Sequence, residues 1–184
     1  MTIVSATSYS NHSPKGPFLM AATAPCLVRP ARADDWPAVA ALLEGLGRPA
    51  VLAGNDAVRH GDLFVLYLAR ADASALVAEV GGVVVGFVDV EFRQRLNHST
   101  RQAWIPDLVV EESHRGRGVG RALLARAEEL ARQRGCWGMA LESAKWRQRA
   151  HAFYRARGWR DASLSFTMPL GETPMRCRSA SESP

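Results

Sequence analysis

Cysteine, lysine and long apolar runs are all scarce in this sequence of 184 residues, and each scarcity excludes a class of protein. The three cysteines are odd in number and have no paired metal-ligand spacing, which argues against both a disulfide framework and a cysteine-bound metal. No apolar run approaches the roughly 18 residues that a membrane span requires. We therefore expect a cytoplasmic protein without a metal ion and without a membrane partner.

Lysine occurs only at positions 15 and 145, so nearly all of the 23 basic residues are arginine. Residues 75–112 hold six acids and three arginines, a local charge of −3, whereas residues 115–160 hold twelve basic residues and three acids, a local charge of +9. A basic segment suits either nucleic acid or a small polyanionic ligand. Because the arginines gather around a glycine-rich loop, without aromatic platforms or a recognition helix, we expect the small ligand and no nucleic-acid partner.

The composition, with 47% hydrophobic and 22% charged residues, is that of a folded domain. Residues 1–25 are rich in Ser, Thr, Asn, Gly and Pro, which predicts an N-terminal tail. The apolar stretch at residues 18–22 lies between two prolines and is too short for the core of a secretion signal. Residues 26–170 then form one predicted domain, and residues 171–184 form a Ser-, Pro- and Glu-rich C-terminal tail.

Hydrophobic periodicity alternates between helical and extended spacing along the predicted domain. Glycines follow most of the helical stretches, and two adjacent glycines separate the strands of a hairpin. The expected elements are a strand at 27–29, helices at 36–46 and 55–69, strands at 76–80, 83–91 and 104–110, a helix from 119 to a glycine at 135, a strand at 139–141, a helix at 147–157 and a strand at 163–170. This order predicts a single mixed α/β domain.

A glycine-rich loop at residues 115–120 joins the strand at 104–110 to the most amphipathic helix. Unpaired N–H groups and the dipole of a helix N-terminus attract anions, and glycines allow a phosphate to approach the backbone closely. The loop lacks the Gly-Lys-Ser/Thr ending of a Walker loop, and its glycine spacing differs from the dinucleotide fingerprint. It could also be a simple change of chain direction.

Two spaced motifs in the sequence resemble those of the GNAT superfamily of N-acetyltransferases. The pattern Arg115-x-x-Gly118-x-Gly120 after a Leu-x-Val strand is similar to the family's acetyl-CoA pyrophosphate loop. The second pattern is similar to the family's closing strand and helix; it comprises Glu142, Ser143, Arg147, Ala150, His151, Phe153, Tyr154, Gly158 and Trp159. The resemblance covers about residues 26–170. Many members have Asn where Arg147 stands, which leaves the role of this position open.

The resemblance implies a mixed, largely antiparallel central sheet with two splayed parallel strands, at 104–111 and 138–143, and helices on both faces. It also implies that acetyl-CoA is a co-substrate bound where these strands separate. The residues expected to bind it are Leu108, Val109, Val110, Arg115, Gly116, Arg117, Gly118, Val119, Gly120, Arg121, Arg147 and Tyr154. In this family the amine attacks the thioester directly, so Cys136 is expected to be a buried residue and not a nucleophile.

Proton transfer requires a base for the incoming ammonium and an acid for the departing thiolate. The resemblance assigns the acid to Tyr154. The base is expected among the carboxylates Asp107, Glu91 and Glu79, or is a water molecule held by them.

The acidic segment at 75–112 favours a small cationic primary amine as acceptor, of the aminoglycoside, polyamine or amino-acid kind. The alternatives are a protein or peptide N-acetyltransferase and a non-catalytic acyl-CoA-binding regulatory module, although the presence of Tyr154 argues against the module. A homodimer is left open.

Overall fold

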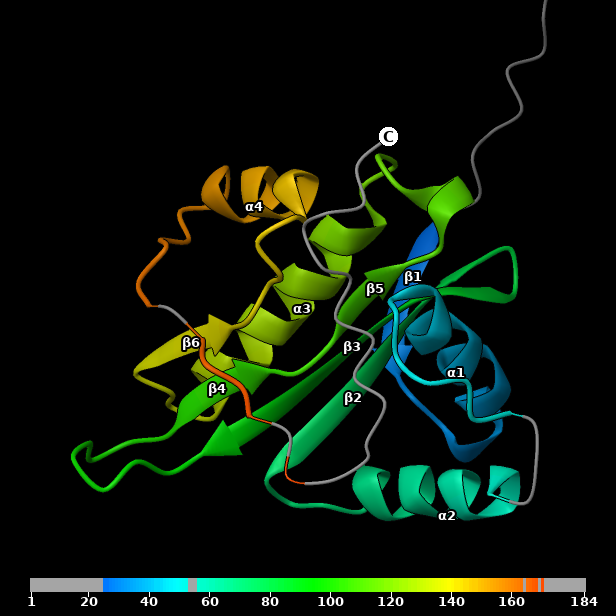
Figure 1. The fold of residues 1–184 in the computed structure, drawn as a ribbon, viewed down its shortest axis with the longest axis horizontal. Coiled ribbons are helices and arrows are strands. Elements are labelled where there is room, and N and C mark those ends of the chain that lie inside the picture. Colours follow the sequence, from blue (N-terminus) through cyan, green and yellow to red (C-terminus); the bar gives the residue numbers. More distant parts are fainter. Residues whose placement is uncertain (1–24, 53–55, 164, 169, 171–184) are drawn as a thin grey trace, which may run out of the picture.

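The computed structural model describes residues 25–52, 56–163, 165–168 and 170, which form one sheet with helices on both faces (Figure 1). Its strands, within the described residues, are β1 (Cys26–Pro30), β2 (Ala73–Val80), β3 (Val83–Arg93), β4 (Gln102–Ile105), β5 (Leu108–Val110) and β6 (Gly138–Leu141). The order is β1-β2-β3-β4-β6, and β5 pairs with β3. Every pair is antiparallel except β4 with β6, which confirms the predicted fold class.

Helices α1 (Trp36–Gly45) and α2 (Ala57–Leu68) cover one face of the sheet, and α3 (Val119–Gln133) covers the other (Figure 1). A fourth helix, α4 (Gln148–Arg155), lies beside the N-terminal end of α3, and single turns of 3-10 helix precede α1 (η1, Ala33–Asp35) and α3 (η2, Glu112–His114). The regular spacing of buried residues along α3 places one apolar stripe against the sheet. This stripe consists of Val119, Leu123, Leu124, Ala127 and Ala131.

Strand β3 passes through the middle of the molecule and contributes to both apolar cores. From Phe87 onward its side chains alternate between the two faces, as expected for a strand buried on both sides. Phe87 packs against the core under α1 and α2, whereas Val88 and Val90 pack against the core under α3. The hairpin turn between β2 and β3 is formed by Gly81 and Gly82, both with positive φ, as the sequence predicts.

The strand predicted at 104–110 is two strands in the structure, because the chain is interrupted at Pro106 and Asp107. Proline has no N–H group to donate to a neighbouring strand. The next N–H group, that of Asp107, donates to Oδ1 of Asp89 at 2.8 Å. As a result β4 pairs with both β3 and β6, whereas β5 pairs only with β3. The two central strands therefore separate after residue 105.

The prediction of a strand at 163–170 is also wrong. The described residues of this segment, 163, 165–168 and 170, have no regular secondary structure. Alternation of apolar residues produces a strand only when a neighbouring strand supplies backbone partners, and the side chains of Phe166 and Met168 remain exposed. The predicted tails at 1–25 and 171–184 lie outside the described residues, except for Pro25.

Helix α3 lies so close to β3 that Gly86 has no room for a side chain. A Cβ atom at this position would lie 2.9 Å from Cδ1 of Leu123 and 3.2 Å from Cγ1 of Val119, both in fully buried residues. We therefore expect Gly86→Ala to lower the free energy of unfolding by about 1–3 kcal/mol, the usual cost of overpacking a core. Chemical denaturation of the variant measures this change.

The matched control is Gly138→Ala in β6. No atom lies within 4 Å of a Cβ at Gly138, so this substitution should leave stability nearly unchanged. Equal stability of the two variants would contradict the close packing of α3 on β3.

Candidate active site

The glycine-rich loop ends at the N-terminus of α3, where Gly118 is the N-cap residue. Gly116 and Gly118 have φ angles of 75° and 88°, a conformation that glycine adopts far more readily than other residues. No side chain caps the helix, and a Cβ atom at either glycine would meet nothing within 4 Å. The first N–H groups of α3 are thus accessible to an anion, and the helix dipole favours its binding. These features fit a phosphate-bearing ligand.

The loop is connected to β5 by Arg115, whose Nε atom donates to the carbonyl oxygen of Val110 at 3.0 Å. Hydrogen bonds from Asp89 to the carbonyl of Asp107 and from Glu111 to the carbonyl of Val85 fix the alternation of the β3–β5 ladder. In this alternation the N–H and C=O groups of Leu108 and Val110 point away from β3, toward the side where β6 has ended. The free edge of β5 can therefore hydrogen-bond an extended ligand.

The remaining residues predicted to bind acetyl-CoA fall into three groups. Val109 and Val119 are buried in the cores on opposite faces of the sheet, so their side chains position the backbone. Arg117 and Arg121 are exposed beside the loop. Gly120 allows close packing, since a Cβ atom there would lie 3.5 Å from Val110 and 3.8 Å from Phe153.

Tyr154 lies on α4 and packs against Phe153 and Trp159, with ring centroids 5.3 and 5.9 Å apart. Burial raises the pKa of its phenol, although the nearby positive charge of Arg147 partly opposes this effect. A phenol in these surroundings stays protonated at neutral pH. It is thus in the form that a proton donor requires, and its role as the acid stays a prediction.

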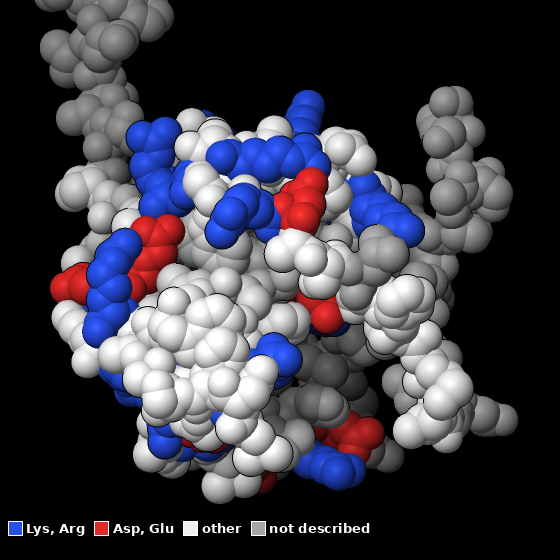
Figure 2. Space-filling view, turned by 90° about the vertical axis from the view of Figure 1, so that its left-hand side faces the viewer, with Lys and Arg blue, Asp and Glu red and all other residues white. Residues whose placement is uncertain are grey.

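Arg147, whose role the sequence left open, connects α4 to the segment after α1. Its guanidinium donates to the carbonyl oxygen of Leu46 and stacks on Trp146, 4.7 Å from the ring centroid. Burial lowers the pKa of Arg147, and the positive charge of Arg48 adds to this effect. Figure 2 shows arginine and lysine side chains gathered over the upper part of the face on which α4 lies. The arginines of the loop at 115–120 and Arg147 therefore place positive charge beside the free edge of β5.

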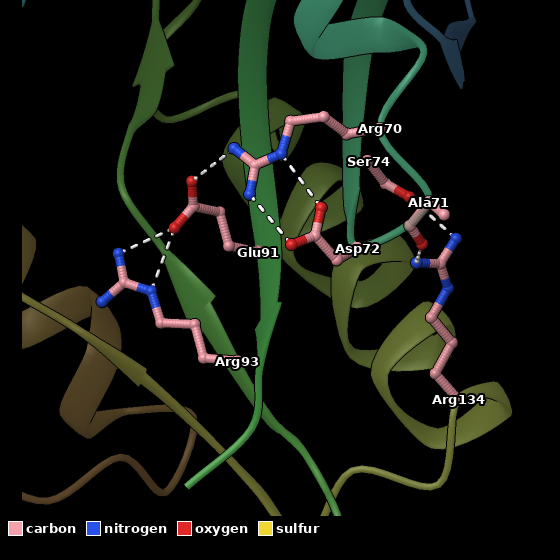
Figure 3. A network of polar contacts seen from close by, with 7 residues as sticks. All are labelled: Arg70, Ala71, Asp72, Ser74, Glu91, Arg93 and Arg134. Atoms are coloured by element: carbon pink, nitrogen blue, oxygen red, sulfur yellow. Dashed lines mark hydrogen bonds and ion pairs between the residues drawn. The ribbon is translucent and has the colours of Figure 1, made fainter.

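Asp107 and Glu91, two of the predicted bases, both have arginine partners. Oδ1 of Asp107 accepts from Nε and Nη2 of Arg48, at 2.9 and 2.7 Å. The two carboxylate oxygens of Glu91 contact Arg70 and Arg93, each at 3.0 Å or less (Figure 3). Burial raises the pKa of Glu91, but hydrogen bonds from Arg93 and Arg70 outweigh this effect and hold it below its usual range. Glu91 is thus stabilised as an anion, and Asp107 is held in an ion pair with Arg48.

The third candidate, Glu79, lies near the hairpin end of β2 and pairs with Arg29 at 2.9 Å. The residue of β2 that pairs with Asp89 is Ala75, four positions before Glu79. Glu79 is therefore displaced from the point where the central strands separate. Its interaction with Arg29 belongs to the packing of β1 on β2.

Sequence reasoning did not single out Asp89, which lies next to the strand interruption. It is only 9% exposed, and its Oδ1 atom accepts the N–H of Asp107. Burial, followed by the negative charge of Asp107, raises the pKa of Asp89 to about 7. The available signal was a charged residue in the apolar run of residues 83–90, at a position where the alternation points inward.

A pocket of about 200 Å³ opens between α1, α2 and the sheet beside Asp89 and Asp107. Trp36 and Tyr67 also line it, and in the described part of the chain both the indole N–H and the phenol O–H are buried without a hydrogen-bond partner. This pocket and the glycine-rich loop lie on opposite faces of the sheet and flank β5. The arrangement can hold one ligand along the free edge of β5 and a second ligand in the pocket, next to the end of the first.

Within the described ranges, no group of three or more His, Cys, Asp or Glu side chains is arranged to hold a metal ion. The same part of the chain contains no helix that is both long and apolar enough to cross a membrane.

Comparisons with known proteins agree with this geometry. The model of the acetyltransferase (GNAT) family matches residues 42–159. Aminoalkylphosphonate N-acetyltransferase of Salmonella typhimurium is 32% identical over 145 residues, which are 79% of this chain and 92% of that protein. Aminoglycoside N(6')-acetyltransferase type 1 of Stenotrophomonas maltophilia is 33% identical over 109 residues, covering 56% of this chain and 71% of that protein.

The fold is also shared with a solved structure, glucosamine-6-phosphate N-acetyltransferase from Arabidopsis thaliana, with a TM-score of 0.68. The two are 17% identical, and the likeness covers 80% of this chain and 99% of that chain. The sequence matches, the parallel β4–β6 pair and the loop at the start of α3 lead to one conclusion: this chain belongs to the GNAT family and is an N-acetyltransferase.

Proposed function

We propose that the protein transfers the acetyl group of acetyl-CoA to a small primary amine, which attacks the thioester directly between the splayed strands. The observation that carries this proposal is the continuity between the anion-binding loop at the start of α3 and the free edge of β5. Relatives named for their action on an aminoalkylphosphonate and on an aminoglycoside support a small amine as acceptor.

The loop residues 115–120 and Arg121 would hold the pyrophosphate through backbone N–H groups and arginine side chains. The outward N–H and C=O groups of Leu108 and the N–H of Val110 would hydrogen-bond the extended pantetheine chain. Acetyl-CoA supplies the acetyl group as a thioester. A backbone N–H group of β5 would stabilise the negative charge that develops on the carbonyl oxygen during attack.

The cysteines that the structure describes do not favour a covalent acetyl-enzyme. Cys136 packs against the core under α3, and burial raises the pKa of its thiol. Cys26 is exposed on β1, the strand at the far edge of the sheet from β6. A thiol is a strong nucleophile only as the thiolate. Direct attack by the amine therefore accounts for the site better than a cysteine intermediate.

Tyr154 would donate a proton to the departing thiolate, and a carboxylate near the strand interruption would receive the proton of the ammonium. Asp107 and Glu91 remain candidates for this second role, although each is already paired with arginine. The acidic groups face the α1 and α2 side of the sheet, and α4 carries Tyr154 at the open end of the splay. The acceptor and the leaving group would thus have separate proton partners.

One observation favours a second acceptor class, an amine that also carries an acidic group. Among the described residues, Arg147 has no acidic partner within ion-pair distance, and it lies near Arg48 at the mouth of the site. The Salmonella relative is named for an aminoalkylphosphonate, an amine that carries an acidic phosphonate group. An acidic group on the acceptor would neutralise the two arginines.

Acetyl-CoA is expected to raise the melting temperature of the protein, because a ligand that binds only the folded state stabilises it. At one hundred times its Kd the gain is about 2.7 kcal/mol. Gly118→Leu should abolish this shift, since a side chain at the N-cap would block the loop. Differential scanning fluorimetry with and without acetyl-CoA measures both effects.

The control for this variant is Gly135→Leu at the opposite end of α3. Gly135 also has a positive φ, 63°, so the backbone strain is comparable, but the position is remote from the loop. If Gly118→Leu keeps the full acetyl-CoA shift, the loop does not bind the pyrophosphate.

An acceptor panel read by thiol release tests the substrate class. We expect small primary amines to be acetylated and peptide N-termini to react poorly, because the pocket beside Asp89 holds only about 200 Å³. The rate of acetylation of cationic amines should fall as ionic strength rises, since at 0.1 M salt the interaction between exposed charges is largely screened beyond about 10 Å. A preference for aminoalkylphosphonates over matched alkylamines would identify the second acceptor class, whereas turnover of peptides alone would contradict both.

Tyr154→Phe is expected to lower kcat by on the order of 10²-fold, because it removes the proton donor and keeps the ring that packs against Phe153 and Trp159. The acetyl-CoA shift in melting temperature should be unchanged. Steady-state kinetics under conditions where the chemical step limits the rate provide the measurement. Turnover within about threefold of the wild type would assign Tyr154 a packing role only.

A further inference from the structure

We infer that Asp89 is the general base that takes the proton of the acceptor's ammonium group, and that the pocket between α1, α2 and β3 holds this amine. The inference rests on the proposed function and goes further by naming the base and the amine subsite. Its evidence comes from the geometry around Asp89 and from the unpaired groups that surround the pocket.

The first observation is that Asp89 has no cationic partner. Among the described residues, no Lys, Arg or His side chain lies within ion-pair distance of its carboxylate, whereas Asp107 contacts Arg48 and Glu91 contacts Arg70 and Arg93. Buried carboxylates in proteins are normally paired with a positive charge. An ammonium group in the adjacent pocket would supply the charge that Asp89 lacks.

The second observation is that the pocket contains two further unsatisfied groups. The hydroxyl of Tyr67 and the indole N–H of Trp36 are buried and have no hydrogen-bond partner among the described residues. Such groups are rare in folded proteins, and each calls for an explanation. A small ligand could place its amine against Asp89 and an adjacent oxygen or nitrogen against Trp36 or Tyr67. It would then give a partner both to the carboxylate and to one of these unsatisfied groups.

The third observation is that the carboxylate of Asp89 is held in place. Its Oδ1 atom accepts the N–H of Asp107 at 2.8 Å, so the side chain is fixed against the strand interruption. This interruption is also where β5 begins and where the outward groups of Leu108 become available. A base at this position lies next to the segment that would hold the thioester.

The protonation behaviour of Asp89 agrees with this role. Burial and the charge of Asp107 raise its pKa to about 7, so it is mostly ionised at pH 8 and can accept a proton near neutral pH. The groups that face it are Tyr67 and His60 from α2, Asp107 from the β4–β5 connection and Glu91 from β3. Asp107 is paired with Arg48 from the segment after α1, and Glu91 with Arg70 from the segment after α2. The nearby Tyr67 hydroxyl partly opposes this rise in pKa, although it does not meet the carboxylate in hydrogen-bonding geometry. The residues of α1 that line the pocket, Trp36, Val39 and Leu43, are all uncharged.

The reaction balances without any additional reactant. The ammonium gives one proton to Asp89, and the freed lone pair forms the N–C bond to the acetyl carbonyl. Breaking the C–S bond then releases the thiolate, which receives a proton from Tyr154. The nitrogen of the new amide loses its remaining extra proton to solvent, Tyr154 is reprotonated from solvent, and Asp89 releases its own proton there, so one proton is released in total.

The test is the pH dependence of kcat for Asp89→Asn, measured with an acceptor whose own pKa is above about 9. The asparagine can still accept the N–H of Asp107 through its side-chain oxygen, so the local structure should be kept. We expect kcat to fall by on the order of 10²-fold or more and the acidic limb near pH 7 to disappear. The acetyl-CoA shift in melting temperature should remain.

Asp107→Asn is the companion variant, because it removes the neighbouring charge that raises the pKa of Asp89. It should move the acidic limb to lower pH and not abolish it. If the limb disappears in Asp107→Asn and persists in Asp89→Asn, Asp107 is the base and the inference is wrong.

A stability measurement distinguishes the catalytic role from a merely structural one. The pKa of Asp89 is higher in the folded state than its usual value of 3.8, so its ionisation destabilises the fold as pH rises from about 4 to 7. Asp89→Asn should therefore melt higher than the wild type at pH 8, and this advantage should shrink toward pH 4. If Asp89→Asn is more stable but keeps kcat within about threefold of the wild type and retains the acidic limb of the pH profile, the inference is overturned and the proposed function is not affected. Absence of turnover with every amine would overturn the proposed function as well.

Discussion

Pro106 cannot donate a backbone hydrogen bond, and this constraint determines where the central strands of the protein separate. Without that donor the chain leaves the ladder for one step, and the N–H of Asp107 turns to the carboxylate of Asp89 on β3. The chain before this step pairs with β6, and the chain after it does not. The open edge of β5, the position of the glycine-rich loop and the location of the buried carboxylate all follow from this interruption.

Charge is distributed around the interruption in a way that separates two binding tasks. Arginines of the loop lie near the open end of the splay, and acidic groups face α1 and α2 on the opposite side of β5. Two arginines cross this division. Arg48 pairs with Asp107, and Arg147 reaches from α4 to the carbonyl of Leu46. The segment after α1 is therefore joined both to the β4–β5 connection and to the start of α4. The α1 and α2 side of the sheet and the side of the glycine-rich loop are thereby held in a fixed relation.

Much of the fold was predictable from the sequence because its signals are local. The apolar stripe of α3, the double-glycine turn and the loop at residues 115–120 each depend on residues close together in the chain. The division of the strand at Pro106 was missed, although proline is its cause, because an apolar run on both sides favoured one continuous strand. The strand predicted at 163–170 failed for a different reason, since strand formation depends on a distant partner that periodicity does not reveal. Asp89 was missed because its surroundings come from α2 and the β4–β5 connection, which only the folded chain brings together.

The alternation of side chains along β3 has a consequence for how the protein can change over evolution. From Phe87 onward, odd-numbered residues face α1 and α2, and even-numbered residues face α3. A substitution at an odd position alters the surroundings of the pocket proposed for the amine but does not enter the layer that holds α3 and its loop. The pocket proposed for the amine and the loop proposed for acetyl-CoA are therefore under nearly independent selection along a single strand, so the residues around one can change while the other stays intact.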